Sequence, residues 1–316
     1  MVENYTADGQ ARAVPRALAG LRLDQALVKM FPQYSRNRLQ AWLKSGHVKV
    51  RRGASDVVVE ASTQVIGGER IELTPPAAAG AGLAPAQRLP LKVVFEDDDL
   101  IVIDKPAGLV VHPGAGNPDH TLLNALLAHA PSLRLVPRAG IVHRLDKDTT
   151  GLLVVAKNLT AQARLAAQLA ARSVKRTYFA LVHGSPPAHG AIDAPVGRDT
   201  RARTRMAVTH RGKEARTSYR VLERFAHGSR TAALVECRLE TGRTHQIRVH
   251  LQHIRHPLVG DPVYRRGAGG GIEFARQALH AAELELVHPR TGRRKAWKAA
   301  LPADMKKLLA QLRRAG

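Results

Sequence analysis

The chain of 316 residues holds a single cysteine, Cys237, which excludes an intramolecular disulfide and a zinc site built from several cysteines. Aromatic residues make up only 4% of the sequence, too few for the broad stacking platform that sequence-tolerant single-strand binders use. No apolar run approaches the roughly 18 residues that span a bilayer. The first residues, MVENYTADGQ, lack the features of a secretion signal. We therefore expect a soluble cytoplasmic protein with no membrane partner.

Motifs for nucleotide, metal and hydrolase chemistry are also missing. The glycine-rich stretch at 114–120, GAGNPDH, lacks the Lys-Ser or Lys-Thr pair of a phosphate-binding P-loop. Neither GxSxG nor HExxH occurs. The 15 histidines are scattered, and no acidic residue at ligand spacing accompanies His143, His245 and His250. We expect neither a metal ion nor an organic cofactor.

Acidic residues are few relative to basic ones. Lys and Arg total 49 against 26 Asp and Glu, which gives a formal net charge of +23. A polyanion is therefore the natural partner, and nucleic acid comes before an anionic membrane. The segment 172–216 carries ten basic and three acidic residues, and its part 197–208 is predicted to be a mobile arm or hairpin that grips RNA phosphates. The arginines concerned are Arg198, Arg201, Arg203 and Arg205.

Any such charged stretch can also be an ordinary solvated face. The stretch 289–298, PRTGRRKAWK, is a second and weaker candidate for an RNA-binding patch.

The N-terminal part reads as a small helical and stranded unit. Apolar residues at helical spacing predict a helix over 21–31, and a second helix over 36–45 follows, with Ser35 as its cap and Gly46 as its stop. Short strands are predicted at 47–50 and 69–74. This order of elements resembles the S4 RNA-binding domain, and a small helical domain with a solvated basic face is the alternative. The residues expected to meet phosphates are Arg36, Arg38, Lys44, Lys49, Arg51 and Arg52.

These patterns predict four parts of the chain. We expect an N-terminal tail at 1–17, the S4-like domain at 18–75, a flexible linker at 76–90 and a catalytic domain at 91–316. The linker prediction rests on its many Ala, Pro and Gly residues and on the absence of hydrophobic periodicity.

Strands outnumber helices in the last part. A hairpin is predicted at 91–106 and strands at 151–157, 176–184, 213–225 and 230–240. Helices are predicted from Thr121 and, capped by Thr160, over 161–172. The fold class that follows is α+β, with a mixed, mainly antiparallel sheet flanked by helices.

Two segments place charges and turn residues beside strongly apolar runs, which is typical of a site at a strand end. In 140–158, Asp146 precedes a polar turn and a buried strand. In 239–264, a helix predicted from Thr244 puts Arg248 on its face, and its start near Gly242 offers backbone N–H groups to a phosphate. From position alone, Asp146 could equally be a turn cap, with Asp148 as its equal.

Three motifs resemble those of the RluA-type pseudouridine synthase family. They are HRLDKDTTGLLVVAK at 143–157, KRTYFALV at 175–182 and GRTHQIRVHL at 242–251. With the S4-like domain, the resemblance covers nearly the whole chain. It implies isomerisation of uridine to pseudouridine in RNA, without metal or coenzyme. It also implies that the enzyme is a monomer and that its partner is ribosomal RNA, either 23S RNA or a large-subunit precursor particle. The implied target lies in a hairpin loop at the intersubunit face.

The resemblance implies a role for several side chains. Asp146 is the family's universal aspartate, and Arg248 pairs with it and holds its rotamer. Tyr178 stacks on the target base, although the pattern alone would favour a core tyrosine, and Ile247 packs on the other side. Arg144 enters the space left by the flipped base or contacts the RNA beside it.

Further candidates for substrate contact are Arg243 and His245. The target nucleotide must leave its stack, at a cost of a few kcal/mol. Asp146 could add to C1′, add to C6 or remove the C2′ proton. Two other functions stay open at this point. One is a non-catalytic RNA-binding or ribosome-assembly factor with the same fold, and the other is an RNA hydrolase that uses His and Asp.

Overall fold

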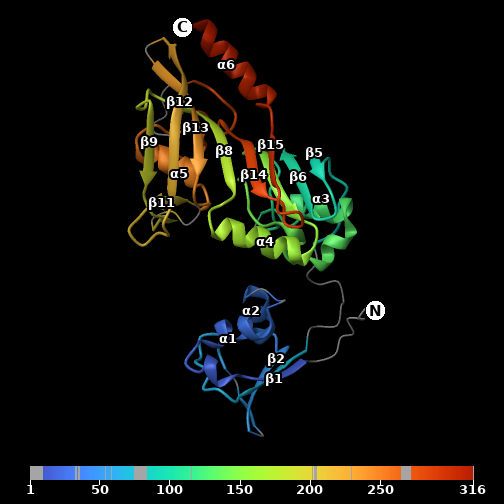
Figure 1. Ribbon diagram of the computed structural model, residues 1–316. Helices are drawn as coiled ribbons and strands as arrows, with labels where there is room; N and C mark the ends of the chain where they lie inside the picture. The colour runs from blue at the N-terminus through green and yellow to red at the C-terminus, as the bar shows by residue number, and fades with distance from the viewer. Residues whose placement is uncertain are drawn as a thin grey trace. The chain divides into compact units, whose positions relative to one another are not determined.

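The computed structural model describes residues 10–315 except 33, 35, 54, 58, 75–83, 115, 201, 203–204, 229 and 265–271. The chain divides into two compact units, residues 1–83 and 84–316 (Figure 1). Within the described ranges, no helix is both long enough and apolar enough to cross a membrane.

The N-terminal unit packs two helices on a four-stranded antiparallel sheet with the order β1-β4-β2-β3. The apolar face predicted for the first helix is buried, and Gly46 ends the second with a φ of 75°. The predicted cap Ser35 lies outside the described residues. The elements are α1 (Leu23–Met30), α2 (Arg36–Lys44), β1 (Gln10–Ala13), β2 (Val48–Arg52), β3 (Ser55–Val57) and β4 (Arg70–Leu73).

Two predicted boundaries were wrong in part. The stretch expected to be a tail contains β1, which pairs with β4, and Val14 is buried in the core. Three of the four β1 side chains are exposed, so main-chain pairing orders this strand and no apolar alternation reveals it. Residues 84–90, expected to be flexible, are hydrogen-bonded to Asn124 of the second unit. The Asn124 side chain donates to the carbonyl of Pro85 at 2.7 Å, and its main-chain carbonyl accepts the Gln87 N–H at 3.0 Å.

The second unit is built on a nine-stranded sheet, ordered β5-β6-β7-β14-β8-β13-β12-β9 with β15 beside β14 (Figure 1). Among the described strands, only the β7–β14 pair is parallel, which confirms the mixed, mainly antiparallel sheet. A separate hairpin, β10–β11, occupies the predicted arm. The strands are β5 (Val93–Glu96), β6 (Leu100–Lys105), β7 (Thr150–Ala156), β8 (Lys175–His183), β9 (His189–Asp193), β10 (Val196–Arg198), β11 (Met206–Val208), β12 (Arg216–His227), β13 (Arg230–Leu239), β14 (Leu279–Val287) and β15 (Arg294–Lys298).

Helices cover both faces of this sheet. Leu165 of α4 and Leu308 of α6 pack on one face, each in its own apolar cluster. Leu126 of α3 and Leu251 of α5 pack on the other face, in the cluster that also contains Tyr178. The helices are α3 (Leu122–His129), α4 (Leu159–Ala170), α5 (Gln246–His253) and α6 (Ala303–Ala315). The two-faced burial explains why the central strand β7 reads as one continuous apolar run.

Helix starts were predicted with mixed success. Thr121 opens α3, as expected, and it forms a capping box with Asn124. The cap of α4 is Asn158 and not Thr160, because the Asn158 side chain accepts the Ala161 N–H at 2.8 Å. Helix α5 begins at Gln246, so Thr244 lies outside it.

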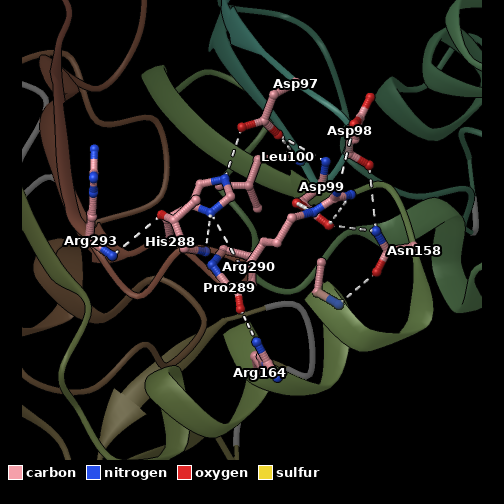
Figure 2. A network of polar contacts seen from close by, with 12 residues as sticks. Asp97, Asp98, Asp99, Leu100, Asn158, Arg164, His288, Pro289, Arg290 and Arg293 are labelled. Carbon is pink, nitrogen blue, oxygen red and sulfur yellow. Dashed lines mark hydrogen bonds and ion pairs between the residues drawn. The ribbon is translucent and has the colours of Figure 1, made fainter.

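A polar clasp joins the β5–β6 turn to the β14–β15 turn (Figure 2). His288 Nε2 bonds Asp97 Oδ2 at 2.8 Å, and Arg290 donates to Asp99 at 2.6 Å. Asp97, Asp99 and His288 have the spacing of metal ligands. However, the atoms that would bind a metal already form the hydrogen bonds to one another and to Arg290, and Asn158 also donates to Asp99. The Arg290 guanidinium is therefore occupied within the protein, which argues against this residue as part of an RNA-binding patch.

Gly151 is needed where β7 meets β14. Its φ is 108°, and a Cβ there would stand 2.2 Å from the carbonyl oxygen of Ala281. We expect Gly151→Ala to lower the free energy of unfolding by about 3 kcal/mol or more, because strain and a main-chain clash add. Gly114→Ala, with nothing within 4 Å of the added Cβ, is the matched control. Equal urea midpoints for the two variants would contradict the prediction.

Candidate active site

The three motif segments line one cavity of about 660 Å³ in the second unit. The first contributes the loop before β7, the second contributes β8, and the third contributes the β13–α5 connection and the start of α5. Asp146, Tyr178 and Arg248 all line this cavity. Residues far apart in the sequence therefore converge, as the motif resemblance led us to expect.

Asp146 and Arg248 form a direct ion pair. Arg248 Nη1 lies 2.9 Å from Asp146 Oδ2, and the arginine side chain is only 4% exposed against 16% for the aspartate. The other edge of the guanidinium forms a fork with Asp261, with Nε at 2.7 Å and Nη2 at 3.0 Å from its two oxygens. Arg248 is thus fixed by Asp261 on one side and orients Asp146 on the other.

Asp261 is itself fixed by the backbone. Its Oδ1 accepts N–H bonds from Val263 at 2.8 Å and Tyr264 at 3.0 Å. Burial acts to raise the pKa of Asp261, but the hydrogen bond and charge of Arg248 outweigh it, so this pKa is lowered. Burial likewise opposes the charged form of Arg248, and its two carboxylates raise the pKa of the guanidinium. The pair stays ionised although it is buried.

His245 and Tyr264 form the next layer around this pair. The Tyr264 hydroxyl bonds His245 Nδ1 at 2.8 Å and accepts the Met206 N–H at 2.9 Å. The Arg248 guanidinium lies over the Tyr264 ring, 5.0 Å from its centroid. His245 adopts a left-handed conformation with φ 57° as it opens α5, and its Nε2 stands 3.8 Å from Asp146 Oδ1. Burial lowers the pKa of His245, which favours the neutral ring near the carboxylate.

The turn that carries Asp146 is held by two buried basic side chains. Lys105 Nζ donates to the carbonyl of Lys147 at 2.7 Å, and Arg276 donates to the carbonyl of Asp148 at 3.0 Å. Within the turn, the Thr149 N–H bonds the Asp146 carbonyl at 3.1 Å. The main chain on the C-terminal side of the carboxylate is therefore fixed from two directions.

Lys105 gives a pH-dependent prediction. Burial lowers the pKa of Lys105 from 10.5 to about 7, although the charges of Asp148 and Asp146 act in the opposite direction. The unfolded chain then holds this proton more tightly than the folded chain between pH 7 and 10.5. Burying the charged ammonium of Lys105 therefore lowers the free energy of unfolding more and more as the pH falls from 10.5 toward 7. The free energy of unfolding rises again as the pH rises.

Relative to Lys105→Met, the wild type should gain about 2 kcal/mol between pH 7 and pH 9. Urea unfolding of both proteins at each pH measures this gain. Parallel pH profiles for the two proteins would refute the assignment.

The remaining cavity residues from the prediction lie around the ion pair. Tyr178 is 5% exposed, and burial raises the pKa of its hydroxyl. Ile247 is 4% exposed and lines the same cavity, as does the exposed Arg144. Arg243 also lines it, and its Nε donates to the carbonyl of Glu214 at 3.0 Å. Their roles stay predictions.

The predicted arm contains the hairpin β10–β11. Arg201 and Arg203 lie outside the described residues. Arg205 stands 5.5 Å from the centroid of the Tyr264 ring, and it is therefore next to the active-site layer. Arg198 has a partner within the chain. The phosphate contacts predicted for these arginines stay untested.

The predicted contact residues of the N-terminal unit differ in how they are engaged. Arg36 bonds the buried Asp24 at 2.8 Å, Arg51 pairs with Asp56 at 2.5 Å, and Arg52 stands 3.5 Å from Glu69. Lys44 and Lys49 are exposed, and the side chain of Arg38 lies outside the described residues. Arg36 thus has a structural contact whether or not it meets RNA.

Sequence reasoning gave no role to several residues of the site. Asp261 and Tyr264 lie in the segment 239–264, but nothing in their spacing pointed to Arg248. Gln246 was also missed; it accepts from Thr241 and donates to Thr217, which ties the start of α5 to β12. A polar residue at a predicted helix start was the available signal.

The cavity is poorly suited to a metal cation. His112 and His143 are half-buried imidazoles that line it, and burial and nearby arginines lower their pKa values to about 4 and about 3. Arginines at the same wall would repel a cation bound by these rings. One oriented carboxylate among cationic and neutral donors instead suits an anionic substrate.

Comparisons with known proteins agree with this chemistry. Residues 99–253 match the model of the RNA pseudouridylate synthase family. The chain is 55% identical to the ribosomal large subunit pseudouridine synthase D of Nitrosomonas europaea, over 95% of this chain and 87% of that one. The protein of the same name from Pseudomonas aeruginosa is 50% identical over 96% of both chains.

Solved structures give the same family. Human RNA pseudouridylate synthase domain containing 1 aligns with a TM-score of 0.55 and 26% identity, over 72% of this chain and 97% of that one. Human RNA pseudouridylate synthase domain containing 4 aligns with a TM-score of 0.54 and 27% identity, over 70% and 93%. The chain therefore belongs to the RNA pseudouridylate synthase family and is an isomerase.

Proposed function

We propose that this enzyme isomerises uridines to pseudouridine in 23S ribosomal RNA, with Asp146 as its catalytic residue. The observation that carries the proposal is the Asp146–Arg248–Asp261 arrangement at the wall of the cavity. The relatives named above, at 55% and 50% identity, support the ribosomal substrate. The target site proposed is a hairpin loop at the intersubunit face.

The reaction breaks the bond between N1 and C1′, turns the base, and joins C5 to C1′. The C5 proton leaves and N1 gains one, so no electrons are exchanged with a cofactor. Arg248 holds Oδ2 of Asp146, whereas Oδ1 accepts no hydrogen bond from the described residues. That oxygen can act on C1′, C6 or the C2′ proton of an extruded nucleotide.

The walls suit a flipped base. Tyr178 offers a ring face and Ile247 an apolar side chain in the same cavity, and a base between them would recover part of the stacking lost on extrusion. Arg144, exposed at the rim, would fill or flank the gap in the RNA.

The partner is proposed to be ribosomal RNA, free or in a large-subunit precursor, and the enzyme to be a cytoplasmic monomer. The strong net charge of +23 supports a polyanionic partner. The N-terminal unit is proposed to be an S4 domain that improves targeting. A fragment starting at Ala84 should then keep chemistry on a small RNA while losing selectivity.

The test maps pseudouridines in ribosomal RNA from cells that lack the protein and from cells complemented with it. Loss of defined pseudouridines and their return supports the proposal, and so does their formation by the purified chain on a 23S transcript. An unchanged pseudouridine map together with an inactive purified protein would refute it. Strand scission would instead indicate the hydrolase alternative.

A further inference from the structure

The wall beside Tyr178 carries a buried arginine without a partner. Arg176 is 7% exposed, and its Nε is buried without a hydrogen-bond acceptor. Within the described ranges it forms no ion pair and no side-chain hydrogen bond. A guanidinium keeps its charge at physiological pH, so the folded protein holds a buried cation that no described residue neutralises.

Two other buried arginines among the described residues show what is missing. Arg248 is gripped by two carboxylates, and Arg276 forms a fork with Asp304 at 2.7 and 3.0 Å. Burying an unpaired charge is costly, and a protein tolerates such a group when a ligand completes it. Arg176 lines the catalytic cavity, so the missing partner belongs to whatever binds there.

Neighbouring groups indicate the chemistry of that partner. His143 Nε2 accepts the Val154 N–H at 3.1 Å, so the ring proton is on Nδ1, which is buried without an acceptor. His112 Nε2 is also buried without a partner, and both rings line the same cavity. A wall with a charged fork and an unused N–H donor requires a ligand that is rich in acceptors and negatively charged.

Geometry places this ligand next to the base. Arg176 and Tyr178 are two positions apart on β8 and therefore share one face, about 6.6 Å apart along the strand. A Cβ at Gly242 would stand 2.6 Å from Arg176 Nη1, so the glycine of the third motif leaves room for the guanidinium. A base on Tyr178 would bring an adjoining phosphodiester to the fork.

We propose that Arg176 binds a phosphodiester adjoining the extruded uridine inside the cavity, an inference that rests on the proposed function. The fork suits two phosphate oxygens at once, which a lysine cannot match. The contact forms only when the nucleotide has left its stack and entered the cavity. It therefore offsets part of the cost of extrusion.

A chemical double-mutant cycle tests the contact. A small target RNA carries either natural phosphates or one neutral methylphosphonate, placed 5′ or 3′ of the target uridine. Arg176→Met and the methylphosphonate on the contacted side should each lower kcat/KM about 10- to 100-fold. Combined, they should lower it no further than either alone.

Two further variants separate charge from geometry. Arg176→Lys keeps the charge without the fork, and Gly242→Ala keeps the arginine but displaces its Nη1, so both should lose activity. Arg220→Met removes an exposed arginine that pairs with Glu236 at 3.2 Å on the same sheet. It should stay close to wild type and keep the full methylphosphonate effect.

The melting temperature of Arg176→Met provides a test that does not require RNA. Removing an uncompensated buried charge should raise the melting temperature of Arg176→Met, whereas removal of a structural arginine lowers it. A lower melting temperature, or losses that multiply in the cycle, would overturn the inference. An inactive wild type on natural RNA would instead count against the proposed function, and the melting temperature would still decide whether Arg176 awaits a ligand.

Discussion

Asp146→Asn should abolish pseudouridine formation, with kcat lowered by at least about 10⁴-fold, as for removal of a catalytic nucleophile or base. The amide is almost the size of the carboxylate but can neither add to carbon nor take a proton. Arg248 keeps its fork with Asp261, so the cavity should retain its shape. RNA affinity should therefore stay within about threefold of wild type. Mass spectrometry of the product and a binding titration measure the two quantities.

Asp148→Asn is the matched control for this variant. By sequence alone Asp148 is as good a candidate, since it lies in the same polar turn. The cavity, however, is lined by Asp146 and not by Asp148, whose carbonyl is held by Arg276. We expect Asp148→Asn to keep activity within about threefold. Residual isomerisation by Asp146→Asn, or an inactive Asp148→Asn, would remove Asp146 from its proposed role.

The fold class could be predicted from the sequence because the patterns that indicate it are local. Continuous apolar runs, alternating strands and turn residues predicted the sheet, and the mixed topology is confirmed by the β7–β14 pair. The sequence patterns did not predict β1, because its side chains are mostly exposed and the strand is held in place by pairing with β4. Thr160 and Asn158 are equivalent as local caps, and the choice depends on Asn158 also bonding Asp99 across the fold.

The site shows the same division. The motif resemblance led us to expect Asp146 beside Arg248, and the two lie 2.9 Å apart. The partner Asp261 and the unpaired Arg176 depend on how separate strands meet, which no spacing rule encodes. Whether a buried charge is paired depends on the tertiary structure. This part of a site therefore cannot be predicted from sequence patterns.

Arg248→Lys should lower kcat about 10²- to 10³-fold and the free energy of unfolding by about 2–4 kcal/mol. A lysine ammonium cannot form the fork with Asp261 and reach Asp146 at the same time, so one buried carboxylate loses its partner. The reacting carboxylate then loses its orientation even though the charge is kept.

Arg313→Lys provides the comparison, because Arg313 forms a similar fork with Glu223, at 2.8 and 2.7 Å, on the exposed surface. There the same exchange should change stability by less than about 0.5 kcal/mol and leave turnover intact. If Arg248→Lys were equally mild in urea unfolding and in single-turnover rates, a positive charge alone would suffice at the site. The geometry of the fork would then not be what positions Asp146, and its burial between two carboxylates would need another explanation.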